Sequence, residues 1–224
     1  MKITGVILTK RGKVTKTKDS LSFCDEIIVV KRNNITDFAE ERNKSLEKAK
    51  NKWVIFLDDD EIVSQPLRHE LSTINYELFS GYYIKRRDFM WGRELKYGET
   101  GSINLLRLAK KNAGLWRRKV HEYWDVSGKV GELNNPILHY PHQSVKEFIE
   151  SINKFSGLHA YANYEENKKS SLIKIIFWPK FKFYYNFFVK LGFLDGIHGF
   201  IVILLMSFHS FLAWSKLWIH QNQK

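Results

Sequence analysis

Cysteine and proline are scarce in this 224-residue chain, which has one cysteine and four prolines. The single cysteine, Cys24, cannot form a disulfide within the chain. This excludes a small disulfide-stabilised scaffold and is compatible with a reducing compartment. The first residues also lack the long apolar stretch and the small-residue cleavage site of a secretory signal, so we expect the main domain to stay in the cytosol.

Acidic residues are outnumbered: 36 lysines and arginines face 24 aspartates and glutamates, which leaves a formal net charge of +12. Such a balance suits nucleic acid, an anionic membrane surface or a phosphate-bearing substrate, and composition alone does not choose among them. Hydrophobic residues make up 44% of the chain, enough for one sizeable core. We therefore expect one compact domain with an appendage.

Three short runs rich in β-branched residues, 3–8, 26–30 and 53–57, have the pattern of buried parallel strands. Residues 37–50, between the second and third runs, place apolar side chains on one face of a helix that Thr36 or Asp37 would begin. Strand, helix and strand in this order predict a right-handed crossover. In such open sheets the ligand crevice lies outside the carboxyl ends of the strands, where residues 58–61 are expected.

Four consecutive acids, Asp58, Asp59, Asp60 and Glu61, follow the third run. In an extended chain, residues i and i+2 point to the same side, so Asp58 and Asp60 would face one pocket while Asp59 points away. Magnesium and manganese ions prefer carboxylate oxygens and complete their shell with substrate phosphates. The run predicts a divalent-cation site for a nucleotide diphosphate, although a solvated acidic turn explains it equally well.

The middle of the chain carries further strand-like runs, which we expect to extend the sheet and form an acceptor-side lobe. These runs are 81–85, 103–108, 119–124 and 136–140. Ser144 and Glu147 then match a capping box that opens a helix to about Tyr161 or beyond.

Aromatic residues alternate with lysines in residues 172–190, a pattern typical of a segment that lies on an anionic membrane surface. Residues 199–214 are apolar but are interrupted by Ser207, His209 and Ser210. A spanning helix needs about 20 mostly apolar residues, so we favour shallow or re-entrant insertion over a full span. The alternative is a soluble helical hairpin that packs on the domain or on a second subunit.

These pieces, taken in order, resemble family 2 glycosyltransferases, and most of all the short bacterial enzymes that add glucose to the inner core of lipopolysaccharide. The matching pieces are 25–30, Arg42-Asn43, 57–61, Arg107-Leu108, Val120-His121-Glu122, 137–140, 192–196 and Gly199-Phe200. The resemblance implies an α/β fold of the GT-A type, a nucleotide-sugar donor and inversion at the anomeric carbon.

The resemblance also implies a division of the chain. Residues 1–165 would form the catalytic domain, with a donor nucleotide half (1–63), an acceptor half (64–143) and a helix (144–165). Residues 166–224 would form a helical membrane-associating region, which is also a route to oligomers.

Site residues carried over from the family fall into three groups. Asp58, Asp60 and His139 would hold a divalent cation, Mn²⁺ or Mg²⁺, while Glu61 supports them. Glu122 would act as the catalytic base, with His121 orienting it or the acceptor; the alternative is that Glu122 pairs with Arg117 or Arg118. The donor would be bound by Thr9, Asn33, Arg42, Asp58, Asp60 and Arg107.

The chain departs from the family pattern after its second run. Val30 is followed by Lys31 and Arg32 where the family has an acid, and the helix of Arg42 begins almost at once. We therefore expect a shortened nucleotide-binding half that lacks a strand and a helix, in which Asn33, Asn34 or Asp37 would substitute for the acid. The signature of processive synthases is absent, which favours a single transfer over polymerisation.

Together these patterns predict a glycosyltransferase at the cytoplasmic face of a bacterial inner membrane. It would move a sugar, glucose or a related hexose, from a UDP-linked donor to a membrane-held glycolipid such as lipopolysaccharide core. One alternative is a noncatalytic membrane-associated protein with a degenerate form of this fold. A second alternative, a basic nucleic-acid-binding protein, has no recognition helix or aromatic RNA-binding signature in its favour, so we expect no nucleic-acid partner.

Overall fold

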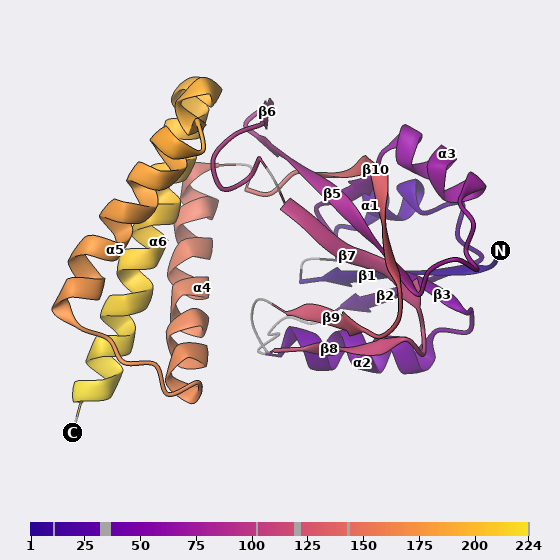
Figure 1. Ribbon diagram of the computed structural model, residues 1–224, viewed down its shortest axis with the longest axis horizontal. Helices are drawn as coiled ribbons and strands as arrows, with labels where there is room; N and C mark the ends of the chain where they lie inside the picture. Colours follow the sequence, from indigo (N-terminus) through magenta and orange to yellow (C-terminus); the bar gives the residue numbers. More distant parts are fainter. Residues whose placement is uncertain (11, 32–36, 102, 119–121, 143, 224) are drawn as a thin grey trace. The chain divides into compact units, whose positions relative to one another are not determined.

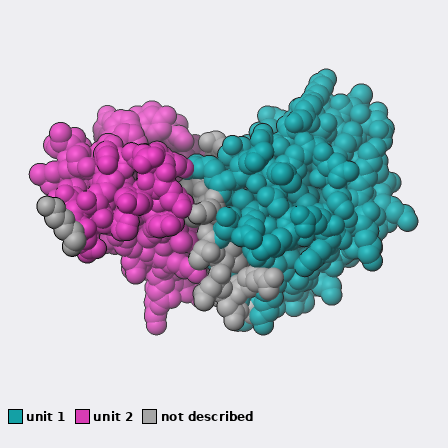
Figure 2. Space-filling model, turned by 90° about the horizontal axis from the view of Figure 1, so that it is seen from below, with its two compact units in different colours: residues 1–87, 103–140 teal, residues 88–102, 141–224 magenta. Residues whose placement is uncertain are grey.

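The computed structural model describes residues 1–10, 12–31, 37–101, 103–118, 122–142 and 144–223. The chain forms two compact units, coloured separately in Figure 2. The first comprises residues 1–87 and 103–140, and the second comprises residues 88–102 and 141–224. The predicted catalytic domain ended at residue 165, whereas the contacts group residues 141–165 with the C-terminal helices.

A mixed sheet forms the centre of the first unit, with the strand order β2-β1-β3-β7-β5-β10-β4. Its strands are β1 (Ile3–Thr9), β2 (Glu26–Lys31), β3 (Trp53–Asp58), β4 (Glu61–Val63), β5 (Gly81–Met90), β7 (Ile103–Lys110) and β10 (Val130–His139). β1 pairs in parallel with both β2 and β3, as the runs of β-branched residues predicted. β7 pairs antiparallel to β3 and to β5. β8 (Gly114–Arg117) and β9 (Tyr123–Val126) form a separate hairpin.

Helices cover both faces of this sheet, so β3 is buried on both sides (Figure 1). Its alternate residues enter two different cores. Trp53, Ile55 and Leu57 pack with Leu21, directly after α1 (Thr15–Ser20), and with α3 (Gln65–Thr73), whereas Val54 and Phe56 pack with α2 (Phe38–Lys48) and the β8–β9 hairpin. The continuous apolar run of β3 is therefore the expected result of burial on two faces.

Two predicted helix starts are confirmed by their capping hydrogen bonds. The Asp37 side chain accepts a hydrogen bond from the Glu40 N–H at 2.9 Å, which caps α2. Ser144 accepts one from the Glu147 N–H at 3.2 Å and begins α4 (Val145–Glu165). Each cap satisfies one of the amide groups that the first helical turn leaves without a partner.

The second unit is a three-helix arrangement with a short strand, β6 (Arg93–Leu95), that pairs with the end of β5. α6 (Gly196–Asn222) packs against both α4 and α5 (Leu172–Tyr184) and lies between them in Figure 1. A π-helical turn (Tyr185–Val189) and a 3-10 turn (Gly192–Asp195) join α5 to α6.

Asp195, in the glycine-rich piece that the resemblance singled out, anchors the loop that follows β6. Its carboxylate is buried and accepts hydrogen bonds from the N–H groups of Lys96 and Tyr97 at 2.9 to 3.1 Å. A side chain at Gly199, in the first turn of α6, would collide with the carbonyl oxygen of Gly192, so position 199 requires glycine. These glycines and Asp195 therefore have a structural role within the second unit.

We expect Asp195→Ala to destabilise the protein by about 2 kcal/mol, because the N–H groups of Lys96 and Tyr97 lose the buried carboxylate that accepts their hydrogen bonds. Chemical denaturation followed by far-UV circular dichroism measures this loss. Asp195→Asn is the matched variant, since it keeps an acceptor oxygen and should retain part of the stability. Equal stability of Asp195→Ala and wild type would show that water replaces the carboxylate at no cost.

Candidate active site

The acidic run lies at the carboxyl edge of the parallel strands, as predicted. β3 ends at Asp58, residues 59 and 60 form a turn, and β4 begins at Glu61. The extended geometry expected for Asp58 to Asp60 is therefore wrong, because the chain turns immediately after Asp58. Side-chain directions beyond that residue are decided by the turn and its neighbours instead of by strand alternation.

Asp58 is held between two buried arginines from different elements. Arg42 of α2 donates through Nη2 to Asp58 Oδ1 at 2.9 Å, and Arg107 of β7 donates through Nη2 to Asp58 Oδ2 at 2.9 Å. Burial alone would raise the pKa of Asp58, but the two guanidinium charges outweigh burial and hold it well below its ordinary value. Asp58 is thus ionised at any physiological pH.

Glu61 is fully buried and completes this cluster on the side of Arg107. Its Oε1 accepts from Arg107 Nη2 at 3.0 Å, and its Oε2 accepts from the Asp58 N–H at 3.0 Å. Arg86 of β5 brings its Nη1 to 3.7 Å from the same Oε1. The predicted supporting role of Glu61 therefore has a geometric basis: it fixes both the backbone of Asp58 and the guanidinium that binds the Asp58 side chain.

Glu122 joins the cluster through Arg42. Arg42 lies 80 residues before Glu122 and donates through Nε to Glu122 Oε1 at 3.2 Å, while its Nη2 lies 3.1 Å from that oxygen. Of the two alternative partners, Arg117 contacts Asp125 among the ion pairs described, and the alternative with Arg118 stays a prediction. Arg42 also stacks on Trp116, with its guanidinium carbon 4.6 Å from the ring centroid. One buried side chain therefore fixes Asp58 and Glu122 together.

Asp59 faces a different neighbour. The Thr9 hydroxyl, at the end of β1, donates to Asp59 Oδ2 at 2.6 Å, and the Thr17 hydroxyl donates to the Asp59 carbonyl oxygen at 3.0 Å. Burial raises the pKa of Asp59, and the hydrogen bond from Thr9 offsets only part of that rise. Thr9 thus belongs to the edge where the donor is expected, where it fastens the turn after β3.

Asp60 is a partly exposed acid of the turn and approaches His139 at the end of β10. Its Oδ1 lies 3.5 Å from His139 Nε2, and its side chain is 40% exposed. His139 is also close enough to Asp58 to help lower the pKa of that carboxyl. The three predicted metal ligands are thus gathered in one region. In the described part of the chain, however, no three histidine, cysteine or acidic side chains are arranged to hold an ion.

Two predicted site residues, Asn33 and His121, lie outside the described residues. The sequence analysis did not identify Arg86 or Trp116 as members of this cluster. The Arg86 side chain is 19% exposed and the Glu61 side chain beside it is fully buried. The sequence contained one signal for Arg86, a charged residue within a strand that also contains apolar residues. Its partner, Glu61, lies on another strand and could not be identified from the sequence.

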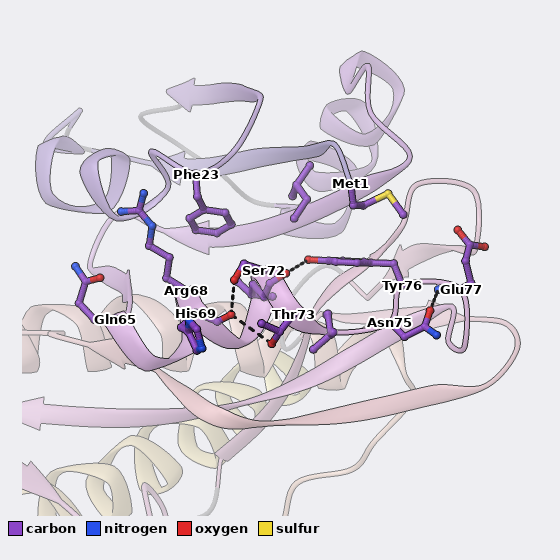
Figure 3. A pocket seen from close by; sticks show the side chains of 13 residues that line it. Met1, Phe23, Gln65, Arg68, His69, Ser72, Thr73, Asn75, Tyr76 and Glu77 are labelled. Atoms are coloured by element: carbon purple, nitrogen blue, oxygen red, sulfur yellow. Dashed lines mark hydrogen bonds between the residues drawn. The ribbon is translucent and has the colours of Figure 1, made fainter.

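A pocket of about 1010 Å³ lies elsewhere in the first unit (Figure 3). Met1, Ile3 and Arg68 are among its lining residues, so it lies at the amino end of β1, whereas the acidic run follows the carboxyl end of β3. Its hydroxyl groups are satisfied locally: Ser72 donates to the His69 carbonyl oxygen. We assign it no part in the site.

Comparison with known proteins places this chain among relatives of one kind, although no protein-family model matches it. It is 27% identical over 187 residues to the lipopolysaccharide core biosynthesis glycosyltransferase LpsC of Rhizobium meliloti, which covers 81% of this chain and 69% of that protein. An uncharacterised glycosyltransferase of Rickettsia bellii is 25% identical over 186 residues, 75% of this chain and 62% of that protein.

Among solved structures, Staphylococcus aureus TarS 1–349 in complex with UDP-GlcNAc matches 99% of this chain and 92% of its own. The TM-score is 0.45 and the identity 11%, a likeness too distant to support an argument about the site. The sequence matches confirm the predicted resemblance: the chain is related to glycosyltransferases, one of which is named for lipopolysaccharide core biosynthesis.

Proposed function

We propose that this protein is a family 2 glycosyltransferase of the GT-A type, with a shortened nucleotide-binding half, that transfers a sugar with inversion from a UDP-linked donor. One observation carries the proposal. The predicted donor-site acid, Asp58, and the predicted base, Glu122, share one buried arginine, although they come from distant parts of the sequence. The relatives supply the reaction class, and this cluster supplies charged groups at the edge where α/β sheets bind ligands.

Glu122 is the proposed base. In an inverting transfer, the acceptor hydroxyl attacks the anomeric carbon, its proton passes to the base, and the bond to the diphosphate breaks. The Glu122 side chain is 17% exposed and is held through Oε1 by Arg42. Its other oxygen then remains available to accept the acceptor's proton while Arg42 fixes its orientation.

We propose that a divalent cation, Mn²⁺ or Mg²⁺, binds beside Asp60 and His139 and completes its shell with phosphate oxygens of the donor. Asp60 offers a partly exposed carboxylate, and His139 offers Nε2 beside it. Asp58 can contribute as well, because each carboxylate oxygen accepts two hydrogen bonds or ligand contacts and the arginines use one on each. When bound, the cation would neutralise charge on the departing diphosphate.

The proposed acceptor is a membrane-held glycolipid of the lipopolysaccharide core class, as the name of the Rhizobium relative indicates for that protein. We place the enzyme at the cytoplasmic face of the inner membrane. Arg42 and Arg107 are committed to carboxylates, so we propose that they bind the donor indirectly, by holding Asp58 in place.

Calorimetric titration of purified protein with a panel of UDP-sugars, with and without Mn²⁺, tests the proposal. We expect metal-dependent binding that Asp60→Ala weakens by at least roughly tenfold. Asp125→Ala is the matched control, since it removes an exposed acid that contacts only Arg117 among the ion pairs described. If folded wild-type protein binds no donor, the noncatalytic alternative replaces this proposal.

A further inference from the structure

Helix α5 buries none of its residues, although it is strongly apolar. Phe177 is 61% exposed, Trp178 52% and Phe181 56%. Ile173 and Tyr184, near the two ends of the helix, are also exposed. Leaving several large apolar side chains in water costs free energy that burial of the same area would recover. The second unit alone therefore leaves this helix without a partner on its outer side.

Helix α6 continues the apolar surface of α5. Phe200 of α6 contacts Phe183 and Phe187 from the α5 side, with ring centroids 6.0 and 5.9 Å apart. Large side chains then recur every three to four residues along α6 and remain partly exposed: Ile197, Phe200, Leu204, Phe208 and Phe211. This spacing places them on one helical face. We call α5 together with this α6 face the aromatic surface.

Charge identifies the partner of the aromatic surface. Residues 167–194 contain no aspartate or glutamate and include Lys174, Lys180 and Lys190; another lysine, Lys182, is paired with Glu99 at 3.0 Å. Lys180 and Lys190 extend along neighbouring rings, 5.8 Å from Phe177 and 5.6 Å from Tyr185. Aromatic rings favour the headgroup level of a bilayer, and lysines near it attract anionic lipid. If the aromatic surface of a second copy packed here instead, its lysines would face these lysines, and the like charges would repel each other.

Helix α6 is the segment whose composition matches a membrane span, with a mean hydropathy of 1.8 over Gly192–Asn222. It also forms hydrogen bonds with α4, which carries charged residues. Lys216 donates to the Asn153 carbonyl oxygen at 2.6 Å and to the Ser156 hydroxyl at 2.8 Å, both on α4. Because α4 carries Glu150 and Lys154, a spanning α6 would either lose these contacts or draw charges into hydrocarbon.

We infer that the aromatic surface binds an anionic bilayer, with α5 embedded at the headgroup level and α6 not crossing the membrane. Helix α6, which hydropathy singles out, thus contributes one exposed face to the surface that meets lipid, and its less hydrophobic neighbour α5 contributes the rest. This inference does not depend on the catalytic assignment, because it concerns only the second unit.

Co-sedimentation with lipid vesicles tests the inference. The full-length protein is mixed with vesicles of phosphatidylcholine alone, or with vesicles in which about a third of the lipid is phosphatidylglycerol. We expect binding to the anionic vesicles that falls by roughly tenfold or more when Phe177 and Trp178 are both replaced by serine. Lys180→Gln with Lys190→Gln should lower binding to anionic vesicles about tenfold and leave binding to neutral vesicles unchanged. Ile149→Ser, on the exposed face of α4, is the matched control and should bind as wild type does.

Trp178→Phe provides a test that does not risk the fold, because it keeps an aromatic ring. Brominated lipids should quench the tryptophan fluorescence of wild type more than that of this variant. Equal binding by the serine variant and wild type would overturn the inference. So would a stable dimer that these substitutions abolish, together with no vesicle binding by wild type.

Discussion

Replacing Glu122 by glutamine is expected to lower the rate constant of sugar transfer by roughly 10²- to 10⁴-fold while leaving donor binding intact. Glutamine has the same shape but cannot take the acceptor's proton. It still offers an oxygen to Arg42, so the cluster around Asp58 should persist. Transfer of radiolabelled sugar from the donor found by calorimetry to a core-type glycolipid measures the rate, and calorimetry on the variant measures donor binding.

Glu132→Gln is the control for this substitution. It makes the same chemical change at an exposed position on β10. Transfer at the wild-type rate by Glu122→Gln would move the base to another residue. Loss of donor binding together with transfer would instead give Glu122 a role in holding the donor site together.

Replacing Arg42 by alanine should have the largest effect on stability, about 3 kcal/mol, which corresponds to a melting temperature lower by roughly 10 °C. Arg42 is 1% exposed and compensates two carboxylates, Asp58 and Glu122, while it stacks on Trp116. Its removal leaves Glu122 without its buried cation, leaves Asp58 with Arg107 alone, and opens a cavity beside the ring. The partial exposure of Asp58 limits the loss, because water can reach that acid.

Lys44→Ala on the same helix is the control for Arg42→Ala. Lys44 pairs with Glu40 at 2.6 Å, but both side chains are exposed, so no measurable change is expected. Arg42→Lys keeps the charge, yet an ammonium group lacks the planar fork that reaches two acids, and its stability should fall between wild type and alanine. An Arg42→Ala protein as stable as wild type would show that the buried acids relax without their cation.

Arg42 and Glu122 should also be coupled in catalysis. If Arg42 acts by orienting Glu122, then Arg42→Lys lowers the transfer rate in wild type but adds little in the Glu122→Gln background. Additive losses would mean that the two residues act independently.

Local features of this protein were largely readable from the sequence. The three parallel strands and the capping residues Asp37 and Ser144 follow from side-chain periodicity and from hydrogen bonds between near neighbours. The position of the acidic run at a strand's carboxyl end followed for the same reason. The order of the remaining strands could not be predicted, because β7, from a later part of the chain, inserts between β3 and β5.

Among the site residues, the sequence singled out Asp58, Asp60, Glu61, Arg107 and Glu122, but not the way they interact. It placed Asp58 and Asp60 on one side of an extended strand, whereas a turn separates them. It weighed local partners for Glu122, whereas the partner is Arg42 of α2.

The sequence by itself determined where strands and helices begin, which segment is acidic and which tail is aromatic and basic, since each depends on residues close together in the chain. Only the tertiary structure decided that one arginine holds both Asp58 and Glu122, and that α6 is the inner helix while α5 remains exposed. The reason is physical: a buried charge takes whichever opposite charge the packed sheet brings within reach, and hydropathy does not record which face a neighbouring helix covers.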